Sequence, residues 1–291
     1  MNKKKQNIKL IDSPLYNYWQ ALYLSFFSRN LYVDISKRWR GYGFIYLLLL
    51  SLIVSIPLSA KLAIKFNNYV ATDVVEPLMK LPVLYIQNGN ITINEPMPYY
   101  IKNKFDEVTA IVDTTGVVKK FDSSFPDLIY LFTKNSVLNR QPISFLSSII
   151  SDYNNEYKIY NYQFDKKTNE IFDGKKFIEG NGIFIIKLFV NILTYPFLGF
   201  FIFGLITGIV VIFVFVGQLA SIIIFKFTLN LKDSFRIFIV ASTPTIFLFF
   251  ASLIVNYRIP GGVISYVALL SVYYSLAIIS IRSMSGKMVH A

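Results

Sequence analysis

The chain of 291 residues contains no cysteine and a single histidine, His290. The absence of cysteine excludes disulfide bonds, iron–sulfur clusters, thiolate zinc sites and cysteine nucleophiles. One histidine next to the C-terminus cannot build a Ser-His-Asp triad or a metal site with several histidine ligands. We therefore expect no catalytic residue, no metal site and no cofactor-binding site.

Charged residues are missing from four long apolar stretches of the chain. A helix rises about 1.5 Å per residue, so a stretch of about 20 apolar residues crosses a hydrocarbon core of about 30 Å. The sequence therefore predicts an integral membrane α-helical bundle with four transmembrane helices. The stretches are Gly43–Ala60 (18 residues), Leu188–Phe225 (38 residues), Ile237–Val255 and Val263–Ile281 (19 residues each).

The net charge of +12 is unevenly distributed along the chain. Residues 1–42, 226–236 and 282–291 hold 13 basic and three acidic residues, whereas residues 61–187 hold 15 basic and 14 acidic residues. Basic residues beside short connections favour the cytoplasmic side of a membrane. We therefore expect both termini inside the cell and residues 61–187 outside. Since this topology accounts for the excess charge, we expect no nucleic-acid partner.

The second apolar stretch is too long for one simple span. As a single helix its 38 residues measure about 57 Å, nearly twice the hydrocarbon core. One interpretation is a single span with an interfacial lead-in over Ile183–Thr194 and a break near Tyr195-Pro196, because proline removes an intrahelical donor. The alternative is two spans joined by a tight turn, which would place Lys226 and Lys232 outside, against the charge rule.

Residues 1–42 form a lead-in to the first span. Ser13-Pro14 has the pattern of a helix start, and Asp34 and Arg38 are spaced to pair one turn apart. Apolar side chains recur here at helical spacing, which is typical both of helices lying in the membrane interface and of helices packed on the bundle. The expected interface anchors are Trp19, Trp39, Arg38 and Arg40.

Residues 61–187 have the charge balance of a small soluble domain, and we expect an inserted α+β domain with a mainly antiparallel sheet. Pro82–Gln87 and Ile91–Asn94 flank an Asn-Gly pair that predicts a hairpin. Ala110–Val112 and Val117-Val118 suggest a second hairpin around Asp113–Gly116. The remaining expectations are a strand at Asp127–Phe132, a helix at Pro142–Ser151, an alternating aromatic strand at Tyr157–Phe164 and a turn at Asp173-Gly174.

Small and polar residues mark the spans themselves. Gly204 and Gly208 are spaced for close helix packing, as are Gly217 and Ser221. Such a face packs within the chain, against a second copy, or along a substrate groove. A polar path through the bundle would involve Gln218, Ser271 and Ser275.

Asp113 is the one acidic residue whose surroundings resemble a catalytic motif. The segment Asp113-Thr114-Thr115-Gly116 has one residue more than the Asp-Thr-Gly loop of aspartic proteases, and it occurs once. Those enzymes need two carboxylates that share a proton. We therefore expect a polar turn at Asp113.

The segment Ala21–Tyr46 resembles the start of a family of uncharacterised bacterial membrane proteins, domain of unknown function 1189 (DUF1189). The similarity lies in Leu31-Tyr32, Arg38-Trp39-Arg40 and Gly41, and it continues at Pro82–Asn94 and Ile111–Gly116. The resemblance implies a bacterial inner-membrane protein without an established set of catalytic residues. The chain is more distantly similar to the Yip1-type multi-span family.

These observations favour a non-enzymatic bacterial inner-membrane protein that spans the lipid bilayer. Its external domain would bind a partner or ligand, and the bundle would anchor it or couple it to a membrane-protein partner or a second copy. The alternative is an accessory subunit or permease for solute or lipid transport. An external hydrolase that uses Asp113 comes third.

Overall fold

The computed structural model describes residues 13–142, 157–180 and 182–289. The chain divides into two compact units. Met1–Ser59 and Tyr195–Ala291 form the helical unit, and Ala60–Thr194 form the β unit. The helix expected at Pro142–Ser151 lies, apart from its first residue, outside the described residues.

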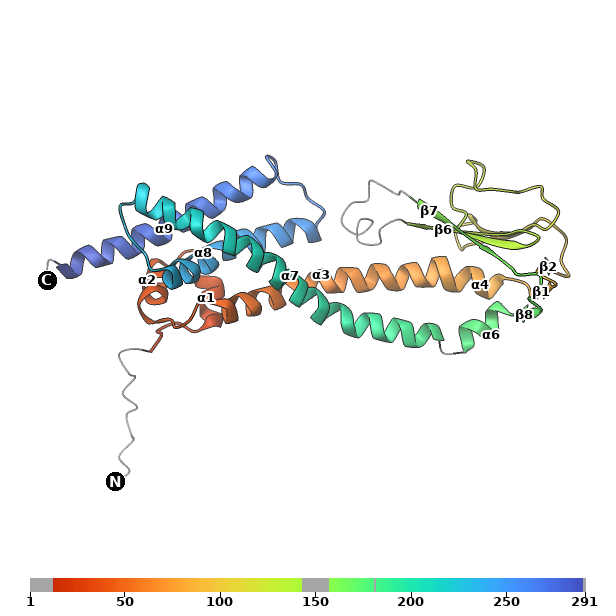
Figure 1. The fold of residues 1–291 in the computed structure, drawn as a ribbon, viewed down its shortest axis with the longest axis horizontal. Helices are drawn as coiled ribbons and strands as arrows, with labels where there is room; N and C mark the ends of the chain where they lie inside the picture. The colour runs from red at the N-terminus through yellow and green to blue at the C-terminus, as the bar shows by residue number, and fades with distance from the viewer. Residues whose placement is uncertain (1–12, 143–156, 181, 290–291) are drawn as a thin grey trace, which may run out of the picture. The chain divides into compact units, whose positions relative to one another are not determined.

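Four helical segments are long and apolar enough to cross a membrane, and in chain order the β-strands come after the first and before the second of them (Figure 1). This arrangement confirms the predicted fold class. The first segment joins α3 (Phe44–Tyr69), the π-helical η1 (Val70–Val75) and α4 (Glu76–Lys80), and the others are α7 (Gly182–Ile223), α8 (Leu231–Ile254) and α9 (Val263–Val289, with its candidate span ending at Ser283).

Helix α7 is continuous over 42 residues and contains Pro196 in its interior. The break expected near Tyr195-Pro196 was therefore wrong. Proline has no backbone N–H, so Pro196 leaves the carbonyl of Ile192 without its usual helical donor, yet the helix runs on through this position. At about 1.5 Å per residue, α7 is about 63 Å long, roughly twice a hydrocarbon core.

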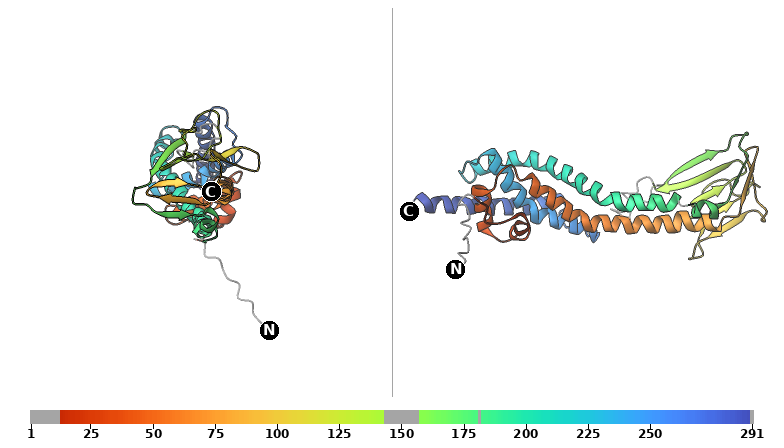
Figure 2. Two further views of the ribbon diagram at one scale, coloured as in Figure 1. Left: turned by 90° about the vertical axis from the view of Figure 1, so that its right-hand side faces the viewer. Right: turned by 90° about the horizontal axis from the view of Figure 1, so that it is seen from below.

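Helix α3 also continues beyond the expected end of the first span at Ala60. Its extension and the start of α7 lie side by side within the β unit (Figures 1 and 2). The side-chain amide of Asn67 donates to the oxygen of Asn191 at 3.1 Å, and the reverse distance is 3.4 Å. The beginning and the end of the inserted segment are thus linked by an amide pair.

Two short helices precede the first span, α1 (Tyr18–Leu24) and α2 (Arg29–Arg38). The helix start expected at Ser13-Pro14 was wrong, because Asn17 caps α1 instead. Its side chain accepts from the Gln20 amide, while the Gln20 side chain accepts from the Asn17 amide. Both helices pack against α8, and α2 also packs against α9. Figure 1 shows them gathered beside α8.

The core of the helical unit combines apolar packing with buried hydroxyl groups. Tyr46 is fully buried at the start of α3, and its hydroxyl lies 2.8 Å from the hydroxyl of Thr243 in the middle of α8. The hydroxyl of Tyr32 in α2 donates to the carbonyl of Ser25 at 2.7 Å. Fully buried apolar residues around them are Leu31, Ile35, Leu47, Leu50, Ile237, Ile239, Ala277 and Ile278.

The β unit contains two sheets. One has the order β2-β1-β8 and the other the order β3-β4-β5-β6-β7. The hairpin predicted around Asn88-Gly89 is confirmed, because β1 and β2 pair antiparallel and both turn residues have positive φ. The strands are β1 (Leu84–Gln87), β2 (Asn90–Thr92), β3 (Tyr99–Lys102), β4 (Val108–Val112), β5 (Tyr130–Phe132), β6 (Ser136–Pro142), β7 (Tyr157–Gln163) and β8 (Glu170–Phe172).

The second predicted hairpin was wrong. Strand β4 pairs antiparallel with β3 on one side and parallel with β5 on the other, and Val117-Val118 lie in the connection that follows it. The turn expected at Asp173-Gly174 is a helix start, since the Asp173 carboxylate caps α6 (Gly174–Glu179) by accepting from two backbone amides. The strand expected at Asp127–Phe132 is present over its second half as β5, and the strand expected at Tyr157–Phe164 is present as β7, one residue shorter.

Candidate functional site

The glycines expected to pack helices differ in their surroundings. A Cβ atom added at Gly204 or Gly208 would meet nothing within 4 Å, so neither glycine makes a close helix contact with the described residues. At Gly217 the added atom would lie 3.0 Å from the ring of Tyr274 in α9. Gly217 is therefore the glycine of this set that allows α7 and α9 to approach each other.

The polar residues expected to form a path through the bundle do not make a common network. The Gln218 side chain donates to the carbonyl of Leu229 at 3.2 Å and so holds the connection between α7 and α8. Ser271 is exposed and donates to the carbonyl of Val267 in its own helix. Ser275 is half-buried in the same helix. These contacts describe local helix and loop bonding.

Asp113 lies at the end of β4 and is 1% exposed. One carboxylate oxygen accepts from the backbone and hydroxyl of Thr115 at 2.8 and 2.5 Å and from the Gly116 amide at 3.2 Å. The other oxygen accepts from the Val118 amide at 2.6 Å. Burial alone would raise the pKa of Asp113, but these four hydrogen bonds favour the charged form and leave the pKa below its ordinary value. The carboxylate orders a turn.

Strand β7 is exposed at all seven positions. It is the last strand of its sheet, and β6 is its single strand neighbour among the described residues. Tyr157, Ile159, Tyr160 and Tyr162 are between 41% and 67% exposed. The guanidinium of Arg140 lies 4.1 Å from the ring centre of Tyr157, and the Lys158 ammonium lies 5.2 Å from that of Tyr160. The strand therefore presents aromatic and basic groups together.

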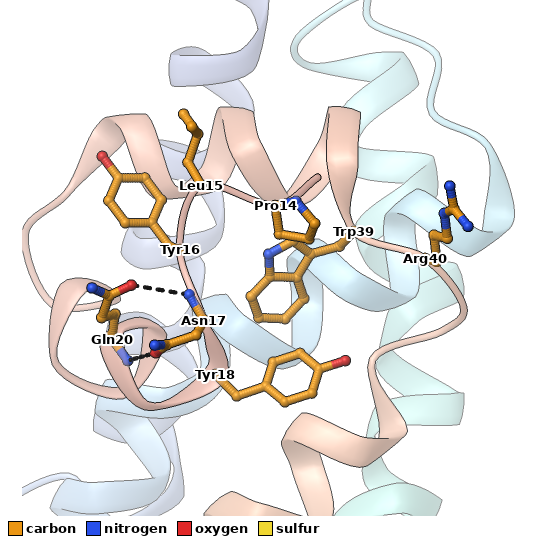
Figure 3. Close-up of a pocket in the computed structure, with 8 residues that line it drawn as sticks. All are labelled: Pro14, Leu15, Tyr16, Asn17, Tyr18, Gln20, Trp39 and Arg40. Carbon is orange, nitrogen blue, oxygen red and sulfur yellow. Dashed lines mark hydrogen bonds between the residues drawn. The ribbon is translucent and has the colours of Figure 1, made fainter. Parts of the chain in front are cut away.

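A pocket of about 450 Å³ lies between the segment Pro14–Tyr18, Gln20 and the residues that follow α2, Trp39 and Arg40 (Figure 3). The two expected tryptophan anchors differ here. Trp39 is 4% exposed and lines the pocket, whereas Trp19 is 63% exposed. Of the two expected arginine anchors, Arg40 lies at the pocket and is exposed, and Arg38 pairs with Asp34 at 3.2 Å as its spacing predicts.

Two buried charged residues in the helical unit were not anticipated in these roles. Asp34 is 3% exposed, and its carboxylate accepts from the amides of Leu15 and Tyr16 in addition to Arg38. Arg236 is 7% exposed, bonds to Asp233 one turn earlier, and donates to the carbonyl of Ser36 at 3.4 Å. The short sequence spacing of Asp233 and Arg236 could have indicated their pairing, but the contacts between α2 and α8 carry no sequence signal.

The described residues contain no cluster of three or more His, Cys, Asp or Glu side chains suited to a metal ion. The four apolar helices and the inserted strands define the class as a multi-pass membrane protein with a β unit inserted after its first span. The sequence profile of the protein family of unknown function DUF1189 matches residues 19–278.

This match covers most of the chain, so the protein belongs to the DUF1189 family. It gives no support to the more distant similarity to Yip1-type proteins. No curated protein and no solved structure matches the chain significantly.

Proposed function

We propose that this protein is a non-enzymatic binding protein of the bacterial cytoplasmic membrane. In this proposal the β unit is extracytoplasmic and binds an extended segment of another protein along β7, while the helical unit anchors it and couples it to the membrane. Both termini are cytoplasmic. The distribution of basic residues around the short connections supports this orientation.

The observation that supports the proposal is that β7 is an outer strand among the described residues, with β6 as its one strand neighbour there. An outer strand leaves alternate backbone amide and carbonyl groups unpaired, and such an edge can accept a further strand from a partner. All seven residues of β7 are exposed, so both faces are accessible next to that edge. Aromatic cross-strand pairs contribute roughly 0.2–1 kcal/mol each, which gives the three tyrosines a direct role in holding an added strand.

The two alternative functions find less support in the contacts. A hydrolase would need Asp113 to reach a substrate, yet both of its oxygens accept hydrogen bonds from the turn that follows. A permease would need a continuous polar path, yet Gln218 and Ser271 are bonded to different backbone segments. The contacts therefore favour binding along the exposed strand β7 over hydrolysis or transport.

Site-specific photo-cross-linking in living cells tests the proposal. A benzoylphenylalanine at Tyr160 or Tyr162 should give a discrete cross-linked species that mass spectrometry identifies as one extracytoplasmic partner. The matched control is Tyr100, which is 42% exposed on β3 at the opposite edge of the same sheet. Equal products from all three positions, or none from β7, would refute binding along this strand.

A further inference from the structure

Helix α1 has two faces of different character. Ala21 and Ser25 are fully buried on the face toward the bundle. Trp19 and Tyr23 lie one turn apart on another face of α1, and Phe27 follows in the turn after the helix, with its ring centre 6.5 Å from that of Tyr23. The three side chains are 63%, 54% and 71% exposed. We call these three residues the aromatic face. Residues four apart lie on the same side of a helix, which aligns Trp19 with Tyr23, and the ring of Phe27 continues this exposed surface among the described residues.

The pocket beside α1 lies at the level where the first span begins. The ring centres of Tyr18 and Trp39 are 4.9 Å apart, and they lie 6.1 and 5.7 Å from the ring of Tyr46 in the first turn of α3. These ring contacts place the pocket next to the N-terminal end of α3, the first candidate span. A helix that enters the hydrocarbon at its first turn places these rings at the depth of the lipid headgroups.

The charge around the pocket is positive. Arg40 lines it, and the ammonium of Lys232 lies 5.7 Å from the ring centre of Tyr42, near the same helix start. The one acidic residue between residues 13 and 42 is Asp34. Its carboxylate is already neutralised by Arg38 and by backbone amides, so it offers little repulsion to an anion.

The pocket also contains a donor that lacks an acceptor. Among the described residues, the indole N–H of Trp39 has no hydrogen-bond partner, although the side chain is 4% exposed. Figure 3 shows this nitrogen directed toward the segment that begins at Pro14, with Asn17 and Gln20 occupied by their mutual hydrogen bonds. Tryptophan donates and never accepts, so the group that completes this site is an acceptor such as a phosphate oxygen.

We infer that the pocket binds the phosphate of a phospholipid headgroup and that the aromatic face lies in the headgroup layer of the same leaflet. Aromatic rings favour this layer because one end of each ring is in an apolar environment and the other is hydrated. Basic pockets next to spans attract anionic headgroups. The inference does not depend on what the β unit binds or on which side of the membrane it lies.

The two tryptophans allow the position of the aromatic face to be measured directly, because the chain contains no others. In full-length protein reconstituted into phosphatidylglycerol–phosphatidylcholine vesicles, Trp39→Phe leaves Trp19 as the single emitter and Trp19→Phe leaves Trp39. We expect lipids with a headgroup nitroxide to quench Trp19 more than lipids with a nitroxide deep in the acyl chain. Trp39 should be weakly quenched by water-soluble iodide. Strong iodide quenching of Trp19 with no quenching by either lipid would overturn the inference and indicate a surface that faces water or a soluble partner.

Native mass spectrometry of the detergent-solubilised protein tests the pocket. Phosphatidylglycerol should bind more tightly than phosphatidylcholine, and Arg40→Gln should weaken that binding about fivefold, the effect expected of one basic residue near an anionic headgroup. Arg29→Gln is the matched control, since Arg29 is exposed in the same unit but does not line the pocket. Equal effects of the two substitutions, or displacement of the lipid by millimolar inorganic phosphate, would overturn the assignment to a lipid headgroup.

Discussion

Replacing Asp113 with asparagine tests whether its carboxylate stabilises the turn that follows β4 or takes part in catalysis. In the folded protein one oxygen accepts three hydrogen bonds and the other accepts the Val118 amide at 2.6 Å. Asparagine has a single side-chain oxygen, so it can accept the hydrogen bonds of only one of the two carboxylate oxygens. Its NH2 group then faces a backbone N–H in the place of the other oxygen. The substitution therefore removes at least one hydrogen bond to a charged group from a buried site.

A hydrogen bond to a charged group contributes about 1.5–3 kcal/mol, and 1.4 kcal/mol corresponds to a tenfold change in an equilibrium constant. Asp113→Asn should therefore increase local opening of the turn by roughly ten- to a hundredfold. Hydrogen–deuterium exchange of the full-length protein measures this change in the peptide that contains residues 115–118. Asp122→Asn is the control, because the exposed Asp122 accepts from the Ser124 amide in a similar local turn. Unchanged exchange after Asp113→Asn would refute the structural role.

The same carboxylate predicts a dependence on pH. The pKa of Asp113 is lowered in the folded protein relative to about 3.9 in an unfolded chain, because the hydrogen bonds outweigh the effect of burial. A lowered pKa contributes stability above about pH 3.9, and this contribution is lost as the pH falls through the folded value. After correction for intrinsic exchange rates, acid should loosen the turn in the wild-type protein and have a smaller effect in Asp113→Asn.

Three further experiments test the helical unit and the topology. Gly217→Leu should lower the melting temperature in detergent because a tyrosine ring already touches this glycine, whereas Gly204→Leu should leave it unchanged; equal effects would contradict the packing. Tyr46→Phe removes a buried hydroxyl contact and should cost about 1 kcal/mol, measured as a lower melting temperature, and an unchanged temperature would count against that contact. Because the chain has no native cysteine, an impermeant thiol reagent should label Lys158→Cys but not Lys232→Cys in intact cells, and the reverse pattern would refute the proposed orientation.

Local signals in the sequence predicted the features that depend on neighbouring residues. Long uncharged stretches identified the four spans, since each span needs only its own residues to be apolar. The Asn88-Gly89 pair identified its hairpin, because both residues adopt positive φ with little cost. The pair of Asp34 and Arg38 followed from the helical period alone.

The features that sequence reasoning missed depend on contacts between distant residues. The parallel pairing of β4 with β5 needs a connection that folds back across the sheet, and a local pattern of strands and turns suggested a hairpin instead. Gly204 and Gly208 had the spacing of a packing face, but spacing alone does not show whether another helix is present. The close approach of Gly217 to Tyr274 and the contact of Arg236 with Ser36 join residues far apart in the chain.

The continuity of α7 bears on the number of spans that this region can form. The amide pair of Asn67 and Asn191 joins the end of α3 to the start of α7, so the β unit begins and ends at the same place. A single helix then carries the chain from Asn191 to Ile223 without reversing direction, over about 48 Å at 1.5 Å per residue. That length exceeds the thickness of a hydrocarbon core, so this part of α7 is long enough for one complete span. Two spans in this region would need a turn within α7, and the helix contains none.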